Sequence, residues 1–206
     1  MQQNIIYQGN SVISVETLPE HSHPVVFKKP SKLHPSRRSL RFLENEFEIT
    51  RSLKDVEGVR KALEYQSQEG QPALILEYID GETLREHIGK KTFNLREKLK
   101  ITIDLTRILG EIHQQDIIHL DLNSKNVLIG NEDQTVRIID LGSAARITGN
   151  AHQKVRPDQM LGTLPYISPE QTGRINRAVD ERSDLYSLGV VLYELMIGHR
   201  FSQSIE

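Results

Sequence analysis

The order of its expected elements predicts an α+β fold with two lobes, because short strands dominate the first part of the chain and amphipathic helices the second. Before residue 80, the chain holds several short runs rich in β-branched residues. After residue 80, apolar residues recur mainly at the three- and four-residue spacings of a helix. We therefore expect a small β-rich lobe at residues 1–79, a larger helical lobe at residues 80–206, and a ligand cleft between them near Tyr78–Gly81.

The first lobe is expected to combine a sheet with one helix. The helix is predicted by the spacing of Leu40, Leu43, Phe47 and Thr50, with Ser39 as its N-cap. A surface turn is expected between the second and third strands, where the chain is polar. The strands are predicted at Ile5–Tyr7, Val12–Glu16, Pro24–Lys28, Val59–Tyr65 and Ala73–Tyr78.

The second lobe is expected to be built on two long helices, after a turn at Asp80–Gly81 and a short helix around Leu84 and Ile88. The polar segment Ser143–Gly162 is predicted to be an irregular loop. The apolar stripes of the long helices are Ile101, Leu105, Ile108 and Ile112, and then Leu185, Leu188, Leu192 and Leu195. Short strands are predicted at Val127–Ile129 and Thr135–Ile139.

Composition excludes several classes of function. The chain has 206 residues, of which 37% are hydrophobic, enough for one sizeable core or two small lobes. It contains no cysteine, which excludes disulfides, thiolate metal sites and a cysteine nucleophile. The net charge of −2 gives no basic field for nucleic acid, and no apolar run is long enough to span a membrane. The expected location is the cytoplasm.

The strongest chemical signal is the run from His119 to Asn126, followed by Asp140-Leu141-Gly142. Phosphoryl transfer from ATP needs metal ions held by hard oxygen ligands and a group that orients the attacking hydroxyl. Carboxylate and amide side chains on two neighbouring loops supply both. We expect Asp121 to orient the hydroxyl and Asn126 and Asp140 to hold magnesium ions.

These two loops resemble the catalytic loop and the magnesium loop of the protein kinase superfamily, of the eukaryotic-like serine/threonine type. Two later segments strengthen the resemblance. Gly162–Glu170 is similar to the end of a kinase activation segment, and Ser183–Gly189 to the start of the helix that anchors the second lobe. The resemblance implies an enzyme that uses ATP and Mg²⁺ to phosphorylate Ser or Thr hydroxyls of a protein substrate.

The resemblance also assigns roles in the first lobe. Lys28 stands where kinases carry the lysine that binds ATP phosphates, and Glu46 where they carry its ion-pair partner. Leu76 takes the gatekeeper position, after which Glu77 and Ile79 are implied to bind adenine through their main chains. The remaining implied nucleotide contacts come from the loop between the first two strands and from the strand after the catalytic loop. They are Gly9 and Leu128.

One segment narrows the resemblance within the superfamily. Ser168–Asp180 is similar to the N-terminal kinase domain of large bacterial sensor proteins. Those proteins continue into an ATPase-like module, a GAF domain and a histidine kinase, so further signalling domains are expected to follow this chain. Kinase second lobes also continue beyond the helix that starts near Asp184. We therefore expect a truncated second lobe whose last helix exposes apolar side chains.

The sequence departs from the kinase pattern at several positions, which keeps two alternatives open. Leu120 replaces the arginine that pairs with a phosphorylated activation segment, and Asn123 replaces the lysine that contacts the transferred phosphate. Gly9 is the only glycine in the phosphate-binding loop, and Leu141 replaces a phenylalanine. These departures favour a pseudokinase or regulatory nucleotide-binding module as the first alternative. The second alternative is a small-molecule kinase of the aminoglycoside phosphotransferase type, a family that shares the His-x-Asp-x-x-x-x-Asn loop and a later metal-binding aspartate but lacks the Gly162–Glu170 segment.

Some polar residues are better explained by structural roles. His119 is expected to be a packed histidine that supports the catalytic loop rather than a general base. Asp184 is expected to bind the backbone of that loop. His21 and His23 lie in a polar surface turn and are expected to be solvated rather than metal ligands.

Overall fold

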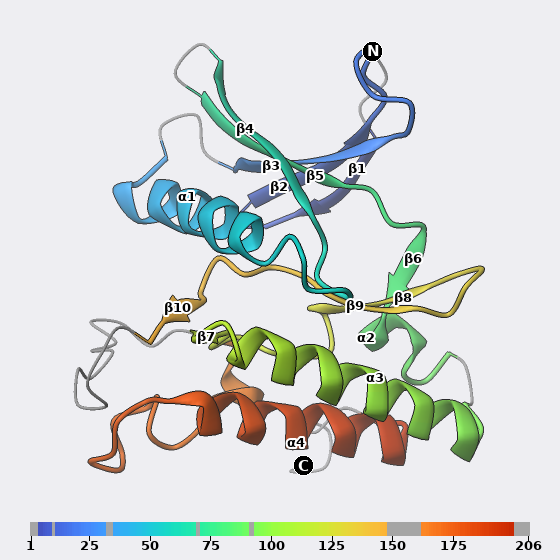
Figure 1. The fold of residues 1–206 in the computed structure, drawn as a ribbon, viewed down its shortest axis with the longest axis vertical. Helices are drawn as coiled ribbons and strands as arrows, with labels where there is room; N and C mark the ends of the chain where they lie inside the picture. The colour runs from blue at the N-terminus through green and yellow to red at the C-terminus, as the bar shows by residue number, and fades with distance from the viewer. Residues whose placement is uncertain are drawn as a thin grey trace.

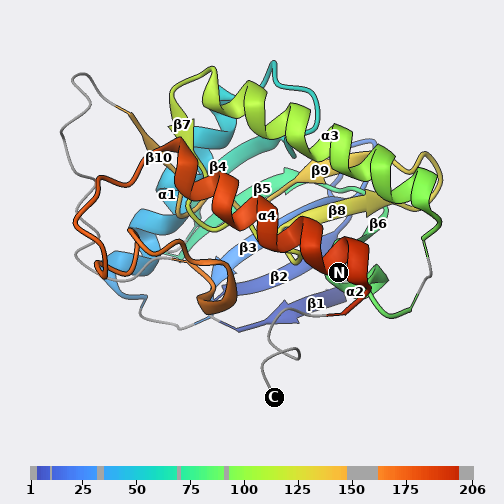
Figure 2. The same cartoon turned by 90° about the horizontal axis from the view of Figure 1, so that it is seen from below.

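The computed structural model describes residues 4–9, 11–31, 35–68, 71–90, 93–147 and 162–199. One part is a twisted antiparallel sheet with helix α1 against one face, and the other part is mainly helical (Figure 1). This arrangement confirms the α+β fold class with a strand-rich first part and a helical second part. Figure 2 shows α3 and α4 side by side beneath the strands.

The sheet of the first part has the strand order β1-β2-β3-β5-β4, with every neighbouring pair antiparallel. Side chains alternate between its faces, so Val25 and Phe27 pack on one face while Val26 and Lys28 point to the other. Leu43 of α1 packs against Val26, which places Lys28 on the face that α1 covers. The strands are β1 (Asn4–Gln8), β2 (Ser11–Glu16), β3 (Val25–Pro30), β4 (Ala62–Gln68) and β5 (Gln71–Glu77).

Helix α1 (Arg37–Ser52) begins earlier than the sequence pattern indicated. Its N-cap is Ser36, whose hydroxyl accepts a hydrogen bond from the backbone nitrogen of Ser39 at 3.1 Å. The assignment of Ser39 as the N-cap was therefore wrong by one turn. A serine can cap from either position, and only the backbone conformation distinguishes them: Ser36 is extended and Ser39 is helical.

The second part contains three α-helices and several short strands within the described ranges. Two small sheets, β6-β8-β9 and β7-β10, bring the loops between α3 and α4 together. The helices are α2 (Leu84–His87), α3 (Leu95–His113) and α4 (Glu181–Ile197), with a 3₁₀ turn η1 (Leu164–Tyr166). The strands are β6 (Gly81–Thr83), β7 (Ile117–Ile118), β8 (Val127–Gly130), β9 (Val136–Ile138) and β10 (Ala145–Arg146).

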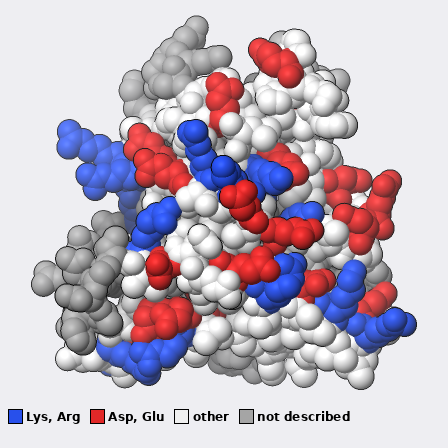
Figure 3. Space-filling view, viewed as in Figure 1, with Lys and Arg blue, Asp and Glu red and all other residues white. Residues whose placement is uncertain are grey.

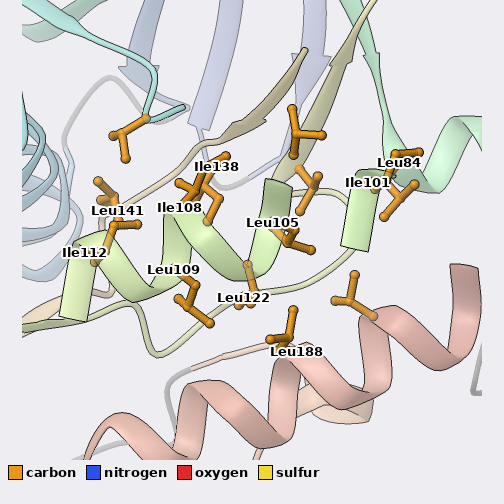
Figure 4. Close-up of a cluster of buried hydrophobic side chains, with 14 of the residues drawn as sticks. Leu84, Ile101, Leu105, Ile108, Leu109, Ile112, Leu122, Ile138, Leu141 and Leu188 are labelled. Carbon is orange, nitrogen blue, oxygen red and sulfur yellow. The ribbon is translucent and has the colours of Figure 1, made fainter. Parts of the chain in front are cut away.

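The core of the second part lies between α3, α4 and the β8–β9 hairpin (Figure 4). Leu105 and Ile112 of α3 are fully buried, as the four- and three-residue spacing predicted. Leu188 of α4 lies beneath Leu122 of the catalytic loop, and Ile138 of β9 lies on the other side of α3. The same core therefore fixes both loops that carry the predicted chemistry.

A short backbone contact joins the two parts behind the cleft. Val59 forms an isolated parallel bridge with Ile138 of β9. The Ile138 nitrogen donates to the carbonyl of Gly58 at 2.7 Å, and the Arg60 nitrogen donates to the carbonyl of Ile138 at 3.1 Å. The segment that follows α1 is thus tied to the strand that leads into Asp140. This contact explains why the predicted strand at Val59–Tyr65 begins only at Ala62.

Other differences from the predicted elements have local causes. Gly81, predicted to be part of a turn, begins β6, which pairs with β8. Its lack of a side chain is needed there, because a Cβ atom would lie 2.5 Å from the carbonyl oxygen of Ile129. Strands β7 and β10 have two residues each, too few to create a sequence pattern. Of the predicted loop Ser143–Gly162, residues 148–161 lie outside the described residues.

Helix α4 exposes apolar side chains, as predicted for the last helix. Leu185 and Ile197 are each about half exposed, at 51% and 53%. Tyr186, Tyr193 and Met196 are also exposed.

Within the described ranges, no helix combines the length and the apolar character that crossing a bilayer requires. Lysine, arginine and acidic side chains are interspersed on the face shown in Figure 3, in line with the small net charge.

Removing a core side chain from α3 should test this packing. Ile112→Ala should lower the free energy of unfolding by about 2–5 kcal/mol, because Ile112 is fully buried and its loss leaves a cavity. Ile103→Ala makes the same change on the same helix at a side chain that is 65% exposed, and should change the free energy by less than about 0.5 kcal/mol. Urea unfolding measures both, and equal effects would contradict the packing described here.

Candidate active site

A cavity of about 510 Å³ opens between the two parts of the molecule. Its lining includes Lys28 from β3, Glu46 from α1, and Asp121 and Asp140 from the two loops of the second part. Residues of the first turn of α1 and Ser11 of β2 also line this cavity. The four charged residues that the sequence assigned to catalysis, phosphate and metal therefore face one space.

Lys28 connects three separate parts of the chain. Its Nζ atom lies 2.6 Å from Glu46 Oε2 and 2.8 Å from Asp140 Oδ1. The register of β3 turns the lysine toward α1, and Glu46 projects from α1 one turn after Leu43. Lys28 and Glu46 are 7% and 2% exposed, so this is a buried ion pair. The structure brings together the lysine and glutamate that the sequence paired.

The charges of this cluster support one another. Burial by itself would lower the pKa of Lys28, but the carboxylates of Asp140 and Glu46 outweigh it and raise that pKa. Burial would raise the pKa of Asp140, but Lys28 more than offsets it and the pKa is lowered. The pKa of Glu46 is raised by burial, with Lys28 acting against the rise. Lys28 is therefore cationic and Asp140 ionised at neutral pH.

The catalytic loop is held from below by Asp184 of α4. Its carboxylate accepts hydrogen bonds from the backbone nitrogens of His119, at 2.7 Å, and Leu120, at 2.8 Å. It also contacts His113 Nε2 at 2.8 Å. These bonds fix Leu120 at a φ of +64°, a conformation uncommon for residues other than glycine. Asp184 thus binds the backbone of the loop, as expected.

His119 is fully buried directly before the strained residue. Its Nδ1 atom accepts a hydrogen bond from the backbone nitrogen of Asp121 at 3.3 Å, and its Nε2 atom contacts the carbonyl of Ile139 at 3.3 Å. The ring therefore spans the catalytic loop and the strand that leads to Asp140. This supports the interpretation of His119 as a packed structural histidine.

Asp121 receives three hydrogen bonds at one carboxylate oxygen. The backbone nitrogen and the hydroxyl of Thr163 each donate to Oδ1 at 2.9 Å, and Asn123 Nδ2 donates at 3.1 Å. Burial raises the pKa of Asp121, with His119 and these donors acting against the rise. Sequence reasoning assigned no role to Thr163 itself, so this contact was missed. The position of Thr163 directly after Gly162, in the segment that resembles the end of a kinase activation segment, was the sequence feature that could have indicated this contact.

Asn126 and Asp140 offer oxygen atoms of the type that magnesium prefers. Asn126 Nδ2 donates to the carbonyl of Asp121 at 2.9 Å, which leaves its amide oxygen as the atom free to bind a cation. Asp140 is ionised and has a φ of +62°. Over the described ranges, no three His, Cys, Asp or Glu side chains surround a common metal position. These donors fit a metal that is also held by substrate phosphates.

The predicted nucleotide contacts Glu77, Ile79 and Leu128 are not among the residues that line this cavity. The backbone nitrogen of Glu77, the last residue of β5, donates to the carbonyl of Lys61 at 2.9 Å. Ile79 lies in the extended segment between β5 and β6, where its backbone forms no hydrogen bond with the described residues. Leu76, at the gatekeeper position, is 1% exposed, and Leu128 in β8 is half-buried.

Gly9 lies in the connection between β1 and β2, where its backbone nitrogen donates to the carbonyl of Ser11 at 3.0 Å. The ring of Tyr7 occupies the place of a side chain there, because a Cβ atom on Gly9 would lie 2.3 Å from the tyrosine oxygen. Among the described residues of this hairpin, Ser11 lines the cavity and Gly9 does not.

Asn123, which replaces the expected lysine, is buried within the catalytic loop rather than open to the cleft. Its Nδ2 atom donates to the carbonyl and Oδ1 of Asp121 and to the hydroxyl of Thr163, and its Oδ1 accepts from the Lys125 nitrogen. It keeps a bridge between the loop and the activation segment without adding a positive charge. Lys125 is exposed.

Two further residues of the site gave no sequence signal. Arg60 is 7% exposed, and burial lowers its pKa. The nearby charges of Glu46, Asp140 and Glu77 act in the opposite direction. Gln171 donates from Nε2 to the carbonyl of Leu120 at 3.0 Å and accepts at Oε1 from the backbone nitrogen and hydroxyl of Ser168. A polar residue next to other polar residues looks solvent-exposed in a sequence, so neither role was visible.

Comparison with known proteins agrees with this geometry. Residues 6–206 match the family of the protein kinase domain, and the chain belongs to that family. Its relatives include the serine/threonine-protein kinases PknB of Mycolicibacterium smegmatis and Mycobacterium leprae, each 35% identical, and PknB of Mycobacterium tuberculosis, 34% identical. Each comparison covers 128 residues, which is 62% of this chain and 20% of the relative. The chain therefore spans about a fifth of the length of the curated relatives it matches.

Neutralising Lys28 should destabilise the fold strongly. Lys28→Met should lower the free energy of unfolding by about 3 kcal/mol, because it leaves the buried carboxylate of Glu46 without its partner. Combining it with Glu46→Gln should recover part of the loss, since the unpaired charge is then removed as well. Chemical denaturation of both variants measures the two effects.

The neighbouring lysine provides the control. Lys29 lies on the half-exposed side of β3 and approaches Glu16 only to 3.9 Å, so Lys29→Met should cost less than about 1 kcal/mol. Equal losses at positions 28 and 29, or no recovery in the double variant, would refute a buried pair as the source of the effect.

Proposed function

We propose that this chain is an ATP- and magnesium-dependent protein kinase domain that transfers the γ-phosphoryl group to Ser or Thr hydroxyls of a protein substrate. The observation that supports this most directly is the gathering of Lys28, Glu46, Asp140 and Asp121 around one cavity. A cation, a metal-binding carboxylate and a hydroxyl-orienting carboxylate are the parts that phosphoryl transfer requires. Membership in the kinase family supports the same reaction.

In this proposal, each residue performs a role that its contacts allow. Lys28, oriented by Glu46, binds the α- and β-phosphates of ATP, for which the β1–β2 connection and the main chains of Glu77 and Ile79 complete the site. Asp121 accepts a hydrogen bond from the substrate hydroxyl and directs it toward the γ-phosphate. Asn126 and Asp140 hold magnesium, which when bound neutralises the charge on the phosphates. Correct alignment and electrostatics supply most of the catalysis.

The proposed biological setting is bacterial signalling. The relatives named above are bacterial serine/threonine-protein kinases, and this chain covers only part of each. The Ser168–Asp180 segment resembles kinase domains that are followed by other signalling modules. We therefore propose that the domain, comprising a first lobe at residues 1–79 and a second at 80–206, acts on a protein substrate in the cytoplasm.

A nucleotide-binding regulatory module without turnover is the second candidate, and Asn123 is the observation that favours it. At this position the kinase pattern places a lysine that contacts the transferred phosphate, whereas the Asn123 amide is neutral and bonded within the protein. A pseudokinase would bind ATP and magnesium at the same residues. Measurement of turnover separates the two candidates.

Replacing the two acidic groups should separate binding from chemistry. Asp121→Asn should lower kcat by about 10²–10⁴-fold and leave the affinity for ATP nearly unchanged, because Asp121 acts on the hydroxyl. Asp140→Asn should abolish the gain in ATP affinity that magnesium provides and should abolish magnesium-dependent turnover. Calorimetry and phosphate transfer to a protein substrate measure these quantities in the same samples.

The matched control is Asp55→Asn, an exposed carboxylate outside the cleft, which should behave as wild type. ATP binding by the wild-type chain without any phosphate transfer would support the regulatory module instead. Full activity in Asp140→Asn would overturn the assignment of the metal site.

The raised pKa of Asp121 predicts a particular pH profile. Ionised Asp121 is the active form, so kcat/KM should fall with acid at a pH above the ordinary aspartate value of 3.8. The hydroxyl of Thr163 favours the ionised form, and Thr163→Val removes this bond. The pKa should then rise further, and the acid limb should move to higher pH.

Thr106→Val makes the same change on the exposed surface of α3 and should leave the pH profile unmoved. An acid limb that stays in place in Thr163→Val, or moves to lower pH, would contradict the proposed role of this bond.

A further inference from the structure

Asn45 connects helix α1 directly to the segment that follows Asp140. Its Nδ2 atom donates hydrogen bonds to the carbonyl oxygens of Gly142, at 3.0 Å, and Ala144, at 2.8 Å. Asn45 is half-buried and precedes Glu46 in the helix. The same turn of α1 therefore reaches the cleft lysine through Glu46 and the magnesium loop through Asn45.

The chemistry of these bonds requires an amide at this position. Both partners are backbone carbonyl oxygens, which only accept hydrogen bonds, and one NH₂ group supplies both hydrogens. An aspartate has nearly the same shape as Asn45 but offers only acceptors when ionised. It would place a charged oxygen against two carbonyl oxygens. The contact therefore depends on the donors and not on the shape of the side chain.

The bonds act on a backbone segment whose conformation needs support. Asp140 has a φ of +62°, which residues other than glycine rarely adopt. Before it, the nitrogen of Ile139 donates to the carbonyl of Asn126 at 3.0 Å. After it, the nitrogen of Ala144 donates to the carbonyl of Leu141 at 3.1 Å and closes a turn. Asn45 holds two carbonyls of this turn, and so it fixes the chain on the far side of Asp140.

These bonds also differ in kind from the other link between α1 and the loop. Lys28 joins Glu46 to Asp140 through charges, and in the proposed function nucleotide and metal compete for those same groups. The bonds of Asn45 use neutral backbone carbonyls and leave the Asp140 carboxylate free. They can therefore persist while Lys28 and Asp140 exchange partners.

We propose that Asn45 is a positioning residue that couples α1 to Asp140 and thereby sets the magnesium-dependent part of the affinity for ATP. This inference rests on the proposed function, because it assigns magnesium to Asp140. Asn45 touches neither nucleotide nor metal in this scheme and acts through the backbone of the magnesium loop. Sequence reasoning did not identify this role, since Asn45 and Gly142 are 97 residues apart.

Calorimetric titration of ATP with and without magnesium tests the proposal on the full chain. In Asn45→Ala and Asn45→Asp, the gain in ATP affinity that magnesium provides should fall about tenfold, as expected from the loss of two hydrogen bonds. Affinity measured without magnesium should change by less than about twofold, because the adenine and lysine contacts do not depend on these bonds. Alanine favours a helix and aspartate conserves shape, so agreement between the two identifies the donors as the cause.

Glu48→Gln provides a control on an exposed position of the same helix and should match the wild type in both titrations. A wild-type chain that gains no affinity from magnesium would overturn the proposed function itself. A wild-type gain that persists in both Asn45 variants would overturn only the role of Asn45. An equal loss with and without magnesium would also overturn it, because Asn45 would then merely support the fold.

Discussion

The buried amine of Lys28 is the interaction on which the arrangement of the cleft depends. A cation that is 7% exposed would be costly without partners, and its two carboxylates come from α1 and from the loop after β9. The charge is therefore satisfied only when the sheet, α1 and the magnesium loop have reached their native positions together. The backbone bonds between Gly58 and Ile138 set that relative position behind the cleft.

A second buried charge organises the catalytic loop from the opposite side. Asp184 is fully buried and accepts two backbone N–H bonds from a loop whose residue Leu120 has a left-handed conformation. Because Asp184 lies in the first turn of α4, the packing of α4 against α3 determines where Asp121 lies relative to Lys28. Gln171 adds a link from the activation segment to the carbonyl of the same strained residue. The position of Asp121 thus depends on α4, on α3 against which α4 packs, and on the activation segment.

Sequence reasoning succeeded where a local pattern carried the information. The spacing in α3 predicted its buried face, and the run from His119 to Asn126 identified a loop that the structure places at the cleft. It failed where the decisive contact is distant in sequence. The bond of Thr163 to Asp121 spans 42 residues, and the buried Arg60 lies in a segment whose backbone pairs with Ile138 of β9. The prediction of the N-cap of α1 failed for a third reason, since Ser36 and Ser39 offered the same local chemistry.

The replacement of the phosphate-contacting lysine by Asn123 changes the charge balance of the cleft. Among the described residues that line the cavity, Lys28 and Arg38 are the cations, whereas Glu46, Asp121 and Asp140 are carboxylates. This described part of the lining carries one more negative than positive group, so in the proposed function a triphosphate without a metal ion would meet net repulsion from it. A divalent cation bound with the triphosphate reverses that balance. Under the proposed function, the neutral Asn123 would make nucleotide affinity depend on metal more steeply than a lysine at this position would.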